Sequence, residues 1–160
     1  MSLSGKAALA MVAPAVAALL ATGSGTAHAA GDLYGAIAVY YTQQSHATGV
    51  GVAADFPTQN AADEAAKNAC NADKCVVMAQ IHNECGSVTE YDAWAAWTNT
   101  VEPVYTTGKG ATAAAAQQAA MDRGNYGMSF PSTAALFAVG AARVVKPLFL
   151  LDTICTSNAG

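Results

Sequence analysis

The sequence predicts a small α+β domain of two ββαβ-like units, with Ala-rich helices packed on antiparallel or mixed sheet and with disulfide staples. Three observations favour this fold. Runs rich in β-branched and aromatic residues alternate with alanine-rich helical segments. The order strand, strand, helix, strand occurs twice, over about residues 33–84 and 85–156. Cysteines lie near the ends of these segments, at Cys70, Cys75, Cys85 and Cys155.

The first unit opens with two strand-like runs and a helix. Residues 34–41 (YGAIAVYY) have the length and composition of a strand. Residues 48–54 indicate a second strand, weakened by glycine, and the two runs together predict a hairpin. A helix is expected over about residues 61–68, because Pro57 breaks the strand and Thr58 can cap a helix. Its apolar face is alanine, which lets a helix backbone lie close to a sheet.

The third strand of the first unit is expected at residues 76–81, followed by a turn at residues 83–84. The second unit then repeats this order with interruptions. Strand-like runs at residues 86–90 and 93–99 are separated by the polar pair at residues 91–92, which we interpret as a break between two strands.

The remainder of the second unit contains a helix and a final strand. Residues 108–110 (GKG) indicate a flexible turn, and Thr112 is expected to cap an alanine-rich helix that ends just before Gly124. Residues 132–145 favour a short inserted helix, capped by Ser132, that covers the sheet edge. The β-branched and apolar residues of segment 143–155 predict the last strand.

The N-terminal residues predict export. Lys6 precedes an apolar run over residues 7–21, and residues 27–29 form an A-x-A cleavage site. We expect residues 1–29 to be a signal peptide and residues 30–160 to form a single secreted domain, extracellular or in the cell envelope. The alternative is an uncleaved anchor, but the apolar run is shorter than the roughly 20 residues that a spanning helix needs.

The composition restricts the expected partners. Charged residues make up 11% of the chain, and the formal net charge is -4 at pH 7. Because no basic stripe is visible in the sequence, neither nucleic acid nor an anionic membrane is an expected partner. We expect a protein or cell-envelope partner, and no transmembrane span once the signal peptide is cleaved.

The densest group of reactive residue types is the segment His82-Asn83-Glu84-Cys85. His82 with Glu84 or Asp55 could form the acid–base pair of a small hydrolase. However, the chain has no G-x-S-x-G elbow and no complete phosphate-binding loop. The C-x4-C spacing also differs from common zinc motifs. We therefore expect no catalytic, cofactor or metal site, and we interpret His82 as a surface residue at a strand end.

Aromatic residues are the candidate interaction residues. Trp94 and Trp97 lie in a strand-like run, and Phe137 lies in the apolar inserted segment. Exposed, they would anchor a partner or, for the inserted segment, a lipid surface. We favour a core position for the two tryptophans, since the helices contribute only alanine. Strand alternation places Trp94 and Trp97 on opposite faces of the sheet.

Several of these features together resemble the domain of unknown function 4189 family, whose members are small exported bacterial proteins, many of them actinobacterial. The shared features are YGAIA at residues 34–38, the alanine helices, the C-x4-C-V-V segment from Cys70, RVVK at residues 143–146 and a terminal cysteine. The resemblance covers about residues 33–156 and departs from the family pattern at residues 126–142 and at Pro147.

The resemblance implies disulfides between Cys70 and Cys75 and between Cys85 and Cys155. From the residues alone, four cysteines in an exported chain allow three pairings. Cys70 and Cys75 flank an expected helix-to-strand turn, which favours the same pairing. The resemblance carries no catalytic residues over to this chain.

The expected function is therefore that of a secreted or cell-envelope-associated interaction protein without enzymatic activity. One alternative is a small extracellular or cell-wall hydrolase that uses His82. Another is a secreted enzyme inhibitor that presents the loop at residues 71–74.

Overall fold

The structure is a computed structural model that describes residues 31–40, 49–70 and 74–159. The expected signal peptide, residues 1–29, lies outside the described residues. The first unit contains β1 (Tyr34–Tyr40), β2 (Val50–Phe56), α1 (Gln59–Cys70) and β3 (Cys75–His82). The second unit contains β4 (Cys85–Ala95), β5 (Thr100–Gly110), α2 (Ala113–Ser129), α3 (Pro131–Ala138) and β6 (Ala142–Cys155).

The two units share one topology. In the first, the strand order is β2-β1-β3, and in the second it is β5-β4-β6. The first strand of each unit therefore lies between its hairpin partner and the strand that follows the helix. The strand pairings within both sheets are antiparallel. The α+β class with two ββαβ-like units is therefore confirmed, and among the described residues α3 has no counterpart in the first unit.

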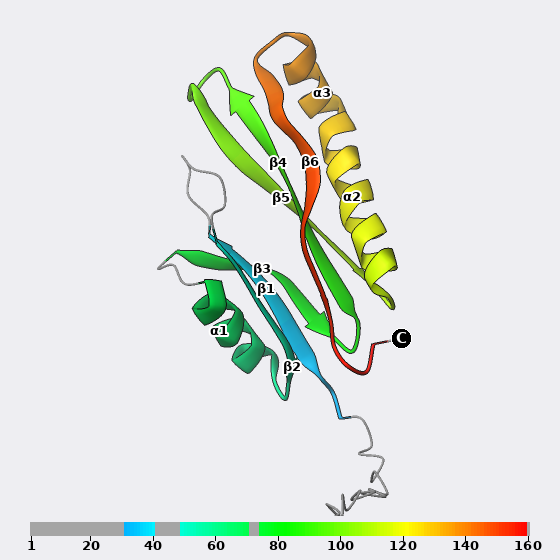
Figure 1. The fold of residues 1–160 in the computed structure, drawn as a ribbon. Coiled ribbons are helices and arrows are strands. Elements are labelled where there is room, and N and C mark those ends of the chain that lie inside the picture. The colour runs from blue at the N-terminus through cyan, green and yellow to red at the C-terminus, as the bar shows by residue number, and fades with distance from the viewer. Residues whose placement is uncertain (1–30, 41–48, 71–73, 160) are drawn as a thin grey trace, which may run out of the picture.

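The elements stack in four layers, with a helix outside each of two facing sheets (Figure 1). One buried cluster joins α1 to the outer face of β1 and β2 through Ala36, Ala38, Ala53, Ala62 and Ala66. The other lies between the sheets, where Ile37, Val39, Ala79 and Ile81 meet Val88 of β4. Alternate residues of β1 therefore serve two different interfaces, as the two-residue period of a strand requires.

Small residues set the distance between each helix and its sheet. Ala62 and Ala66 are fully buried on α1, and Ala116 and Ala120 are fully buried on α2. A side chain at Gly51 in β2 would collide with the backbone of α1, and one at Gly108 in β5 with the backbone of α2. The predicted alanine faces thus dock directly onto glycine-bearing strands.

Three boundaries in the second unit differ from the predictions. β4 continues without a break through Tyr91 and Asp92, which are both buried, because strands on either side satisfy its backbone. The expected turn at residues 108–110 belongs to β5. Helix α2 runs past Gly124, since a side chain there would lie 2.7 Å from Leu148 of β6, so the glycine serves packing and not termination.

Pro147 is accommodated at an irregular position of an edge strand. β6 pairs only with β4, and the register shifts between the pairs Glu90–Phe149 and Asp92–Lys146. Proline lacks a backbone N–H and is tolerated at such positions. In the part of the chain that the structure describes, no helix has the length and apolar character to cross a membrane.

Candidate functional site

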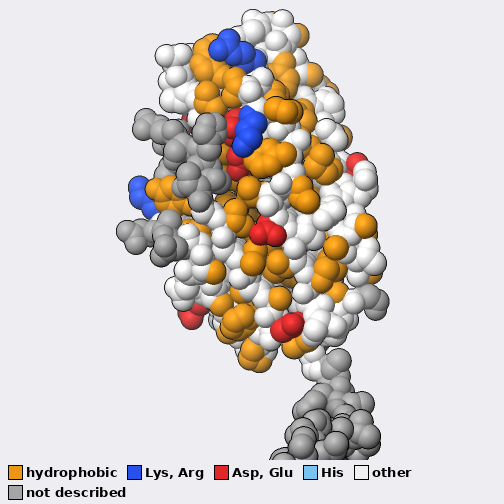
Figure 2. Space-filling model, in the orientation of Figure 1, with side chains coloured by type: hydrophobic (Ala, Val, Ile, Leu, Met, Phe, Trp, Pro, Cys, Tyr) orange, Lys and Arg blue, Asp and Glu red, His pale blue; other side chains and the backbone are white. Residues whose placement is uncertain are grey.

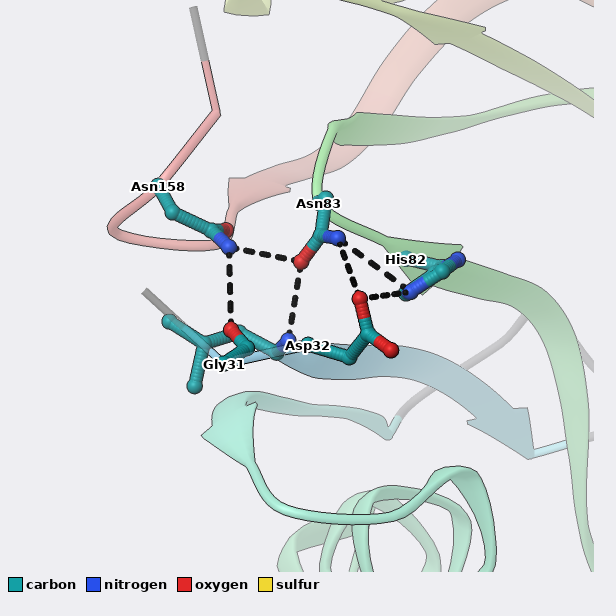
Figure 3. Close-up of polar contacts among 6 residues, drawn as sticks. Gly31, Asp32, His82, Asn83 and Asn158 are labelled. Carbon is teal, nitrogen blue, oxygen red and sulfur yellow. Dashed lines mark hydrogen bonds and ion pairs between the residues drawn. The ribbon is translucent and has the colours of Figure 1, made fainter. Parts of the chain in front are cut away.

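A polar cluster joins the segment before β1 and the segment after β6 to the turn between the two units (Figure 3). The imidazole Nε2 of His82, the last residue of β3, lies 3.0 Å from Asp32 Oδ1. Asn83 Nδ2 donates to the same Asp32 oxygen at 2.9 Å. Asn158, beyond β6, donates to Asn83 Oδ1 at 2.6 Å and to the carbonyl oxygen of Gly31 at 3.4 Å.

The cluster owes its shape to Asn83 and Tyr34. Asn83 has φ of 52°, a left-handed conformation that asparagine tolerates better than most residues, and this turns the chain from β3 towards β4. The ring of Tyr34 stacks on that of His82, with centroids 4.7 Å apart and planes 9° from parallel. Hydrogen bonds from Asn83 and then from His82, together with the imidazole charge, lower the pKa of Asp32.

The carboxylates of the alternative hydrolase hypothesis, Glu84 and Asp55, have other partners than His82. Glu84 Oε1 accepts a hydrogen bond from Lys109 Nζ at 2.8 Å, and Asp55 Oδ1 accepts one from the backbone N–H of Ser157 at 2.7 Å. His82 faces Asp32 instead, a partner that sequence reasoning missed. The antiparallel register that places Tyr34 opposite His82 would have revealed it.

The Asp32–His82 pair lies on an open surface. The side chains of His82 and Asp32 are 49% and 64% exposed. No cysteine thiol is free, because the structure bonds Cys70 to Cys75 and Cys85 to Cys155, the pairing that the resemblance implied. Among the described residues, no three His, Cys, Asp or Glu side chains are grouped as metal ligands. The cluster therefore holds together the segment before β1, the segment after β6 and the turn between the units.

A second candidate site lies at the other end of β4. Two turns meet there, residues 96–99 between β4 and β5 and residues 139–141 between α3 and β6. The backbone N–H of Ala96 donates to the carbonyl oxygen of Ala141 at 2.9 Å, which ties the turns together. Trp97 is 66% exposed and Val139 is 77% exposed. We call these two turns the distal tip.

More apolar side chains are exposed behind the distal tip. Among the described residues, only Val52 and Val76 are exposed large hydrophobic residues in the first unit. The second unit exposes many more, and α3 buries none of its residues. In Figure 2, hydrophobic side chains lie around basic side chains at the upper end of the molecule, where Figure 1 places the tips of β4 and β6. The exposed large hydrophobic residues of the second unit outside the tip are Tyr126, Phe130, Leu136, Val144, Val145 and Leu150, of which Leu150 lies opposite Thr89 in the middle of β4.

The expected interaction residues have separate positions. Trp97 is in the distal tip, whereas Trp94 is partly buried, with the Arg143 guanidinium 4.6 Å from its ring centroid. Phe137 is partly buried on α3, between the exposed Leu136 and Ala138. The expected core position is wrong for Trp97, and Trp94 is only partly buried, because the core between the sheets is built from aliphatic residues. Sequence reasoning missed Val139, which follows the last residue of the short helix α3.

One apolar hollow lies where the edges of the two sheets approach each other. It has a volume of about 440 Å³ and is lined by Val76 and Met78 of β3 and by Glu102, Pro103, Val104 and Tyr105 of β5. Its lining is mainly apolar, and Glu102 and Tyr105 are the lining residues with polar side-chain atoms. The side chains of the distal tip are more exposed, so we treat the tip as the stronger candidate for a docking surface.

Comparison with known proteins identifies a family. No curated protein and no solved structure matches the chain. A family profile described as "Domain of unknown function (DUF4189)" matches residues 34–130. The match spans the first unit and most of the second, and it ends before α3 and β6, although the resemblance was expected to extend to residue 156. The chain belongs to the DUF4189 family of domains of unknown function.

Proposed function

We propose that this protein is a secreted or cell-envelope-associated interaction protein that binds its partner through the distal tip and has no enzymatic activity. The observation that carries the proposal is the high exposure of Trp97 and Val139 on two adjoining turns. Single exposed apolar residues are common on protein surfaces. A group of them at one end of a molecule is typical of an interaction site.

The architecture supports a binding role for this end. Below the distal tip, each sheet has a helix on one face and the other sheet on the opposite face. β4 and β5 each extend over 11 residues, whereas β1 and β2 each extend over 7, so the second sheet is the longer one. Where the second sheet extends beyond the first, its apolar side chains are not covered on both faces, as those of the first unit are.

Export of the protein is supported by two features. The first thirty residues have the pattern of a secretory signal. The two disulfides would persist in an oxidising compartment and would be reduced in most cytosols. Expression of the full chain in a bacterium with a general secretory pathway should yield an exported form whose N-terminal residue is Ala30. Recovery of the full-length chain in the cytosol would contradict export.

The proposed binding role is tested by removing the two tip side chains. The double variant Trp97→Ser/Val139→Ser should keep its thermal unfolding midpoint but lose most of its retention on washed cell envelopes. The matched control is Val76→Ser, which removes an exposed apolar side chain (48% exposed) from the first unit. Equal retention of wild type, tip variant and control would overturn the proposal.

The alternatives have less support. The hydrolase hypothesis now rests on the exposed Asp32–His82 pair, and no hydrogen bond joins a described serine or threonine hydroxyl to that imidazole. The inhibitor hypothesis rests on residues 71–74, of which 71–73 lie outside the described residues. Of the three candidates, the tip has the most exposed apolar side chains among the described residues.

A further inference from the structure

We propose that the two units of this protein exchange between two copies of the chain, and that the turn at Asn83 and Glu84 is the hinge for this exchange. In the exchanged dimer, the first unit of each copy packs against the second unit of the other copy. The partner is therefore a second copy of the chain, and the surface is the face through which each sheet covers the other. This surface is separate from the distal tip.

The two units share no sheet and no disulfide. In the part of the chain that the structure describes, the strands form two separate three-stranded sheets, one in each unit. The Cys70–Cys75 bond lies within the first unit, and the Cys85–Cys155 bond lies within the second. The units can therefore separate without breaking a strand pairing or a disulfide, as an exchange requires.

Side-chain packing joins the two sheets, and a second copy can supply the same packing. Ile81 of β3 lies over Gly86 of β4, and Ile154 of β6 lies over Gly35 of β1, so each sheet places one isoleucine on a glycine of the other. The segment after β6 also hydrogen-bonds to the first unit. None of these contacts requires both units to belong to one chain, so the exchanged dimer retains them.

The connection between the units is a short turn with an unfavourable backbone conformation. Residues 83–84 alone separate β3 from β4. Asn83, which Figure 3 shows at this turn, has φ of 52°, a left-handed conformation that costs free energy for residues with a side chain. Opening of the turn would let Asn83 become extended. Short hinge loops under strain favour domain swapping.

Two features oppose opening of the turn. The Asn83 side chain donates to Asp32 and accepts the backbone N–H of Leu33 at 2.8 Å, which stabilises the closed turn. A short linker also gives one unit an effective concentration in the millimolar range relative to the other. The wild type should therefore be monomeric at micromolar concentration and should form the exchanged dimer when it is refolded at about 1 mM.

The first test compares two asparagines with the same backbone conformation. Asn83→Val should disfavour the closed turn about tenfold and, because the dimer contains two hinges, should raise the dimer association constant about 100-fold. The control is Asn99→Val, since Asn99 has φ of 54° but lies in the turn between β4 and β5, within the second unit. The control should not increase dimer formation.

Sedimentation velocity measures the dimer fraction after refolding from urea with the disulfides intact. Equal dimer fractions for Asn83→Val and Asn99→Val would overturn the proposal. The absence of a dimer both from Asn83→Val and from the wild type refolded at about 1 mM would also overturn it.

A longer turn should have the opposite effect to Asn83→Val. Insertion of two glycines after Asn83 removes the constraint on the closed turn, so it should abolish the dimer that the wild type forms at high concentration. This variant keeps the closed fold and does not depend on whether Asn83→Val folds. A dimer that persists with the longer turn would show that the copies associate without exchange.

A cross-link identifies the exchange directly. Asn158 Nδ2 lies 3.4 Å from the carbonyl oxygen of Gly31, and a side chain at Gly31 would have no neighbour within 4 Å. Chains that carry only Gly31→Cys and chains that carry only Asn158→Cys are refolded together at high concentration. The exchanged dimer should yield a covalent heterodimer well above the yield of either homodimer. A heterodimer yield no higher than that of the homodimers would contradict the exchange.

The tip variant separates this inference from the proposed function. Trp97→Ser/Val139→Ser should leave the dimer fraction unchanged, because the tip lies outside the exchanged surface. Loss of the dimer in this variant would show that the tip joins the two copies, which would overturn the exchange. Full retention of the tip variant on cell envelopes, with the dimer fraction unchanged, would overturn the proposed function alone.

Discussion

The two units close their sheets in different ways at the same topological position. In each unit, the first residue of the central strand lies opposite the last residue of the third strand. In the first unit these residues are Tyr34 and His82, whose rings stack. In the second unit they are Cys85 and Cys155, which form a disulfide. One closure is noncovalent, whereas the other is covalent.

The difference corresponds to the size of each unit and its remaining supports. The first unit is compact, and its own disulfide, between Cys70 and Cys75, joins α1 to β3. The second unit has the longer strands, and β6 is an edge strand that runs for 14 residues from the distal tip to Cys155. The bond to Cys85 fixes the end of this strand to the start of β4. A domain that exposes an apolar tip can thus keep its opposite end firmly anchored.

The largest expected effect concerns the two disulfides. In the chain-entropy model, the Cys85–Cys155 bond stabilises the protein by about 4 kcal/mol and the Cys70–Cys75 bond by about 2 kcal/mol, because the first closes a much longer loop. Denaturant unfolding of Cys85→Ser/Cys155→Ser and of Cys70→Ser/Cys75→Ser should show this order. Limited proteolysis should cut the first double variant earliest in β6. A larger loss from the Cys70–Cys75 variant would contradict this account of the two closures.

The next effect concerns a reciprocal contact between the sheets. A side chain at Gly86 would lie 2.5 Å from Ile81 Cδ1, and one at Gly35 would lie 3.3 Å from Ile154 Cδ1 and 2.9 Å from the carbonyl oxygen of Ala53. Gly86→Ala should therefore destabilise the protein by about 1–3 kcal/mol, as overpacked sites do. Gly127→Ala is the control, because that position has no neighbour within 4 Å.

A double-mutant cycle distinguishes the two sides of this contact. Ile81→Ala should offset part of the cost of Gly86→Ala, with a coupling of about 1 kcal/mol, because only a side chain obstructs the new methyl group. Ile154→Ala should not offset Gly35→Ala, since the backbone of β2 remains in the way. Additive behaviour of Ile81→Ala and Gly86→Ala in urea unfolding would show that the Ile81 side chain is not what opposes the new methyl group.

A smaller effect is expected at the noncovalent closure. His82→Ala removes both the stacking on Tyr34 and the contact with Asp32, and should cost about 1 kcal/mol of unfolding free energy. His82→Phe keeps a ring for stacking and should recover most of that loss, because exposed ion pairs contribute little. If His82→Phe were as unstable as His82→Ala, the Asp32 contact would be the important one.

The smallest effect concerns acid. Hydrogen bonds from Asn83 and His82 lower the pKa of Asp32 below the ordinary value of 3.8. The stabilisation is therefore present above pH 3.8 and is lost as the pH falls through the lower pKa of the folded state. Urea unfolding of Asp32→Asn should show a slightly weaker pH dependence below pH 4 than the wild type. If the variant and the wild type had the same pH dependence below pH 4, the Asp32 carboxylate would not contribute to stability.

Much of the fold could be predicted because its signals are local. Runs such as YGAIAVYY and the alanine-rich segments have the period and composition of single elements, and Thr58 and Thr112 accept hydrogen bonds at the helix starts. The predicted breaks at Tyr91-Asp92 and Gly124 were wrong for one reason. Both were inferred from local propensity, whereas neighbouring strands and Leu148 determine what those positions accept.

The candidate sites were harder to predict because their members are far apart in the sequence. Asp32 and His82 are 50 residues apart and meet only through the register of β1 and β3. Trp97 was recognised as a candidate, but the sequence does not show that its turn adjoins the one that carries Val139.

The sequence by itself determined the order of elements, the alanine faces of the helices and the places of the cysteines. Each of these depends on residues within a few positions of one another, or on a pattern shared with the DUF4189 family. The tertiary structure alone decided which faces are covered, which carboxylate lies beside His82 and which turns form the distal tip. Those features depend on strand register and on sheet length, which act between segments that are distant in the chain.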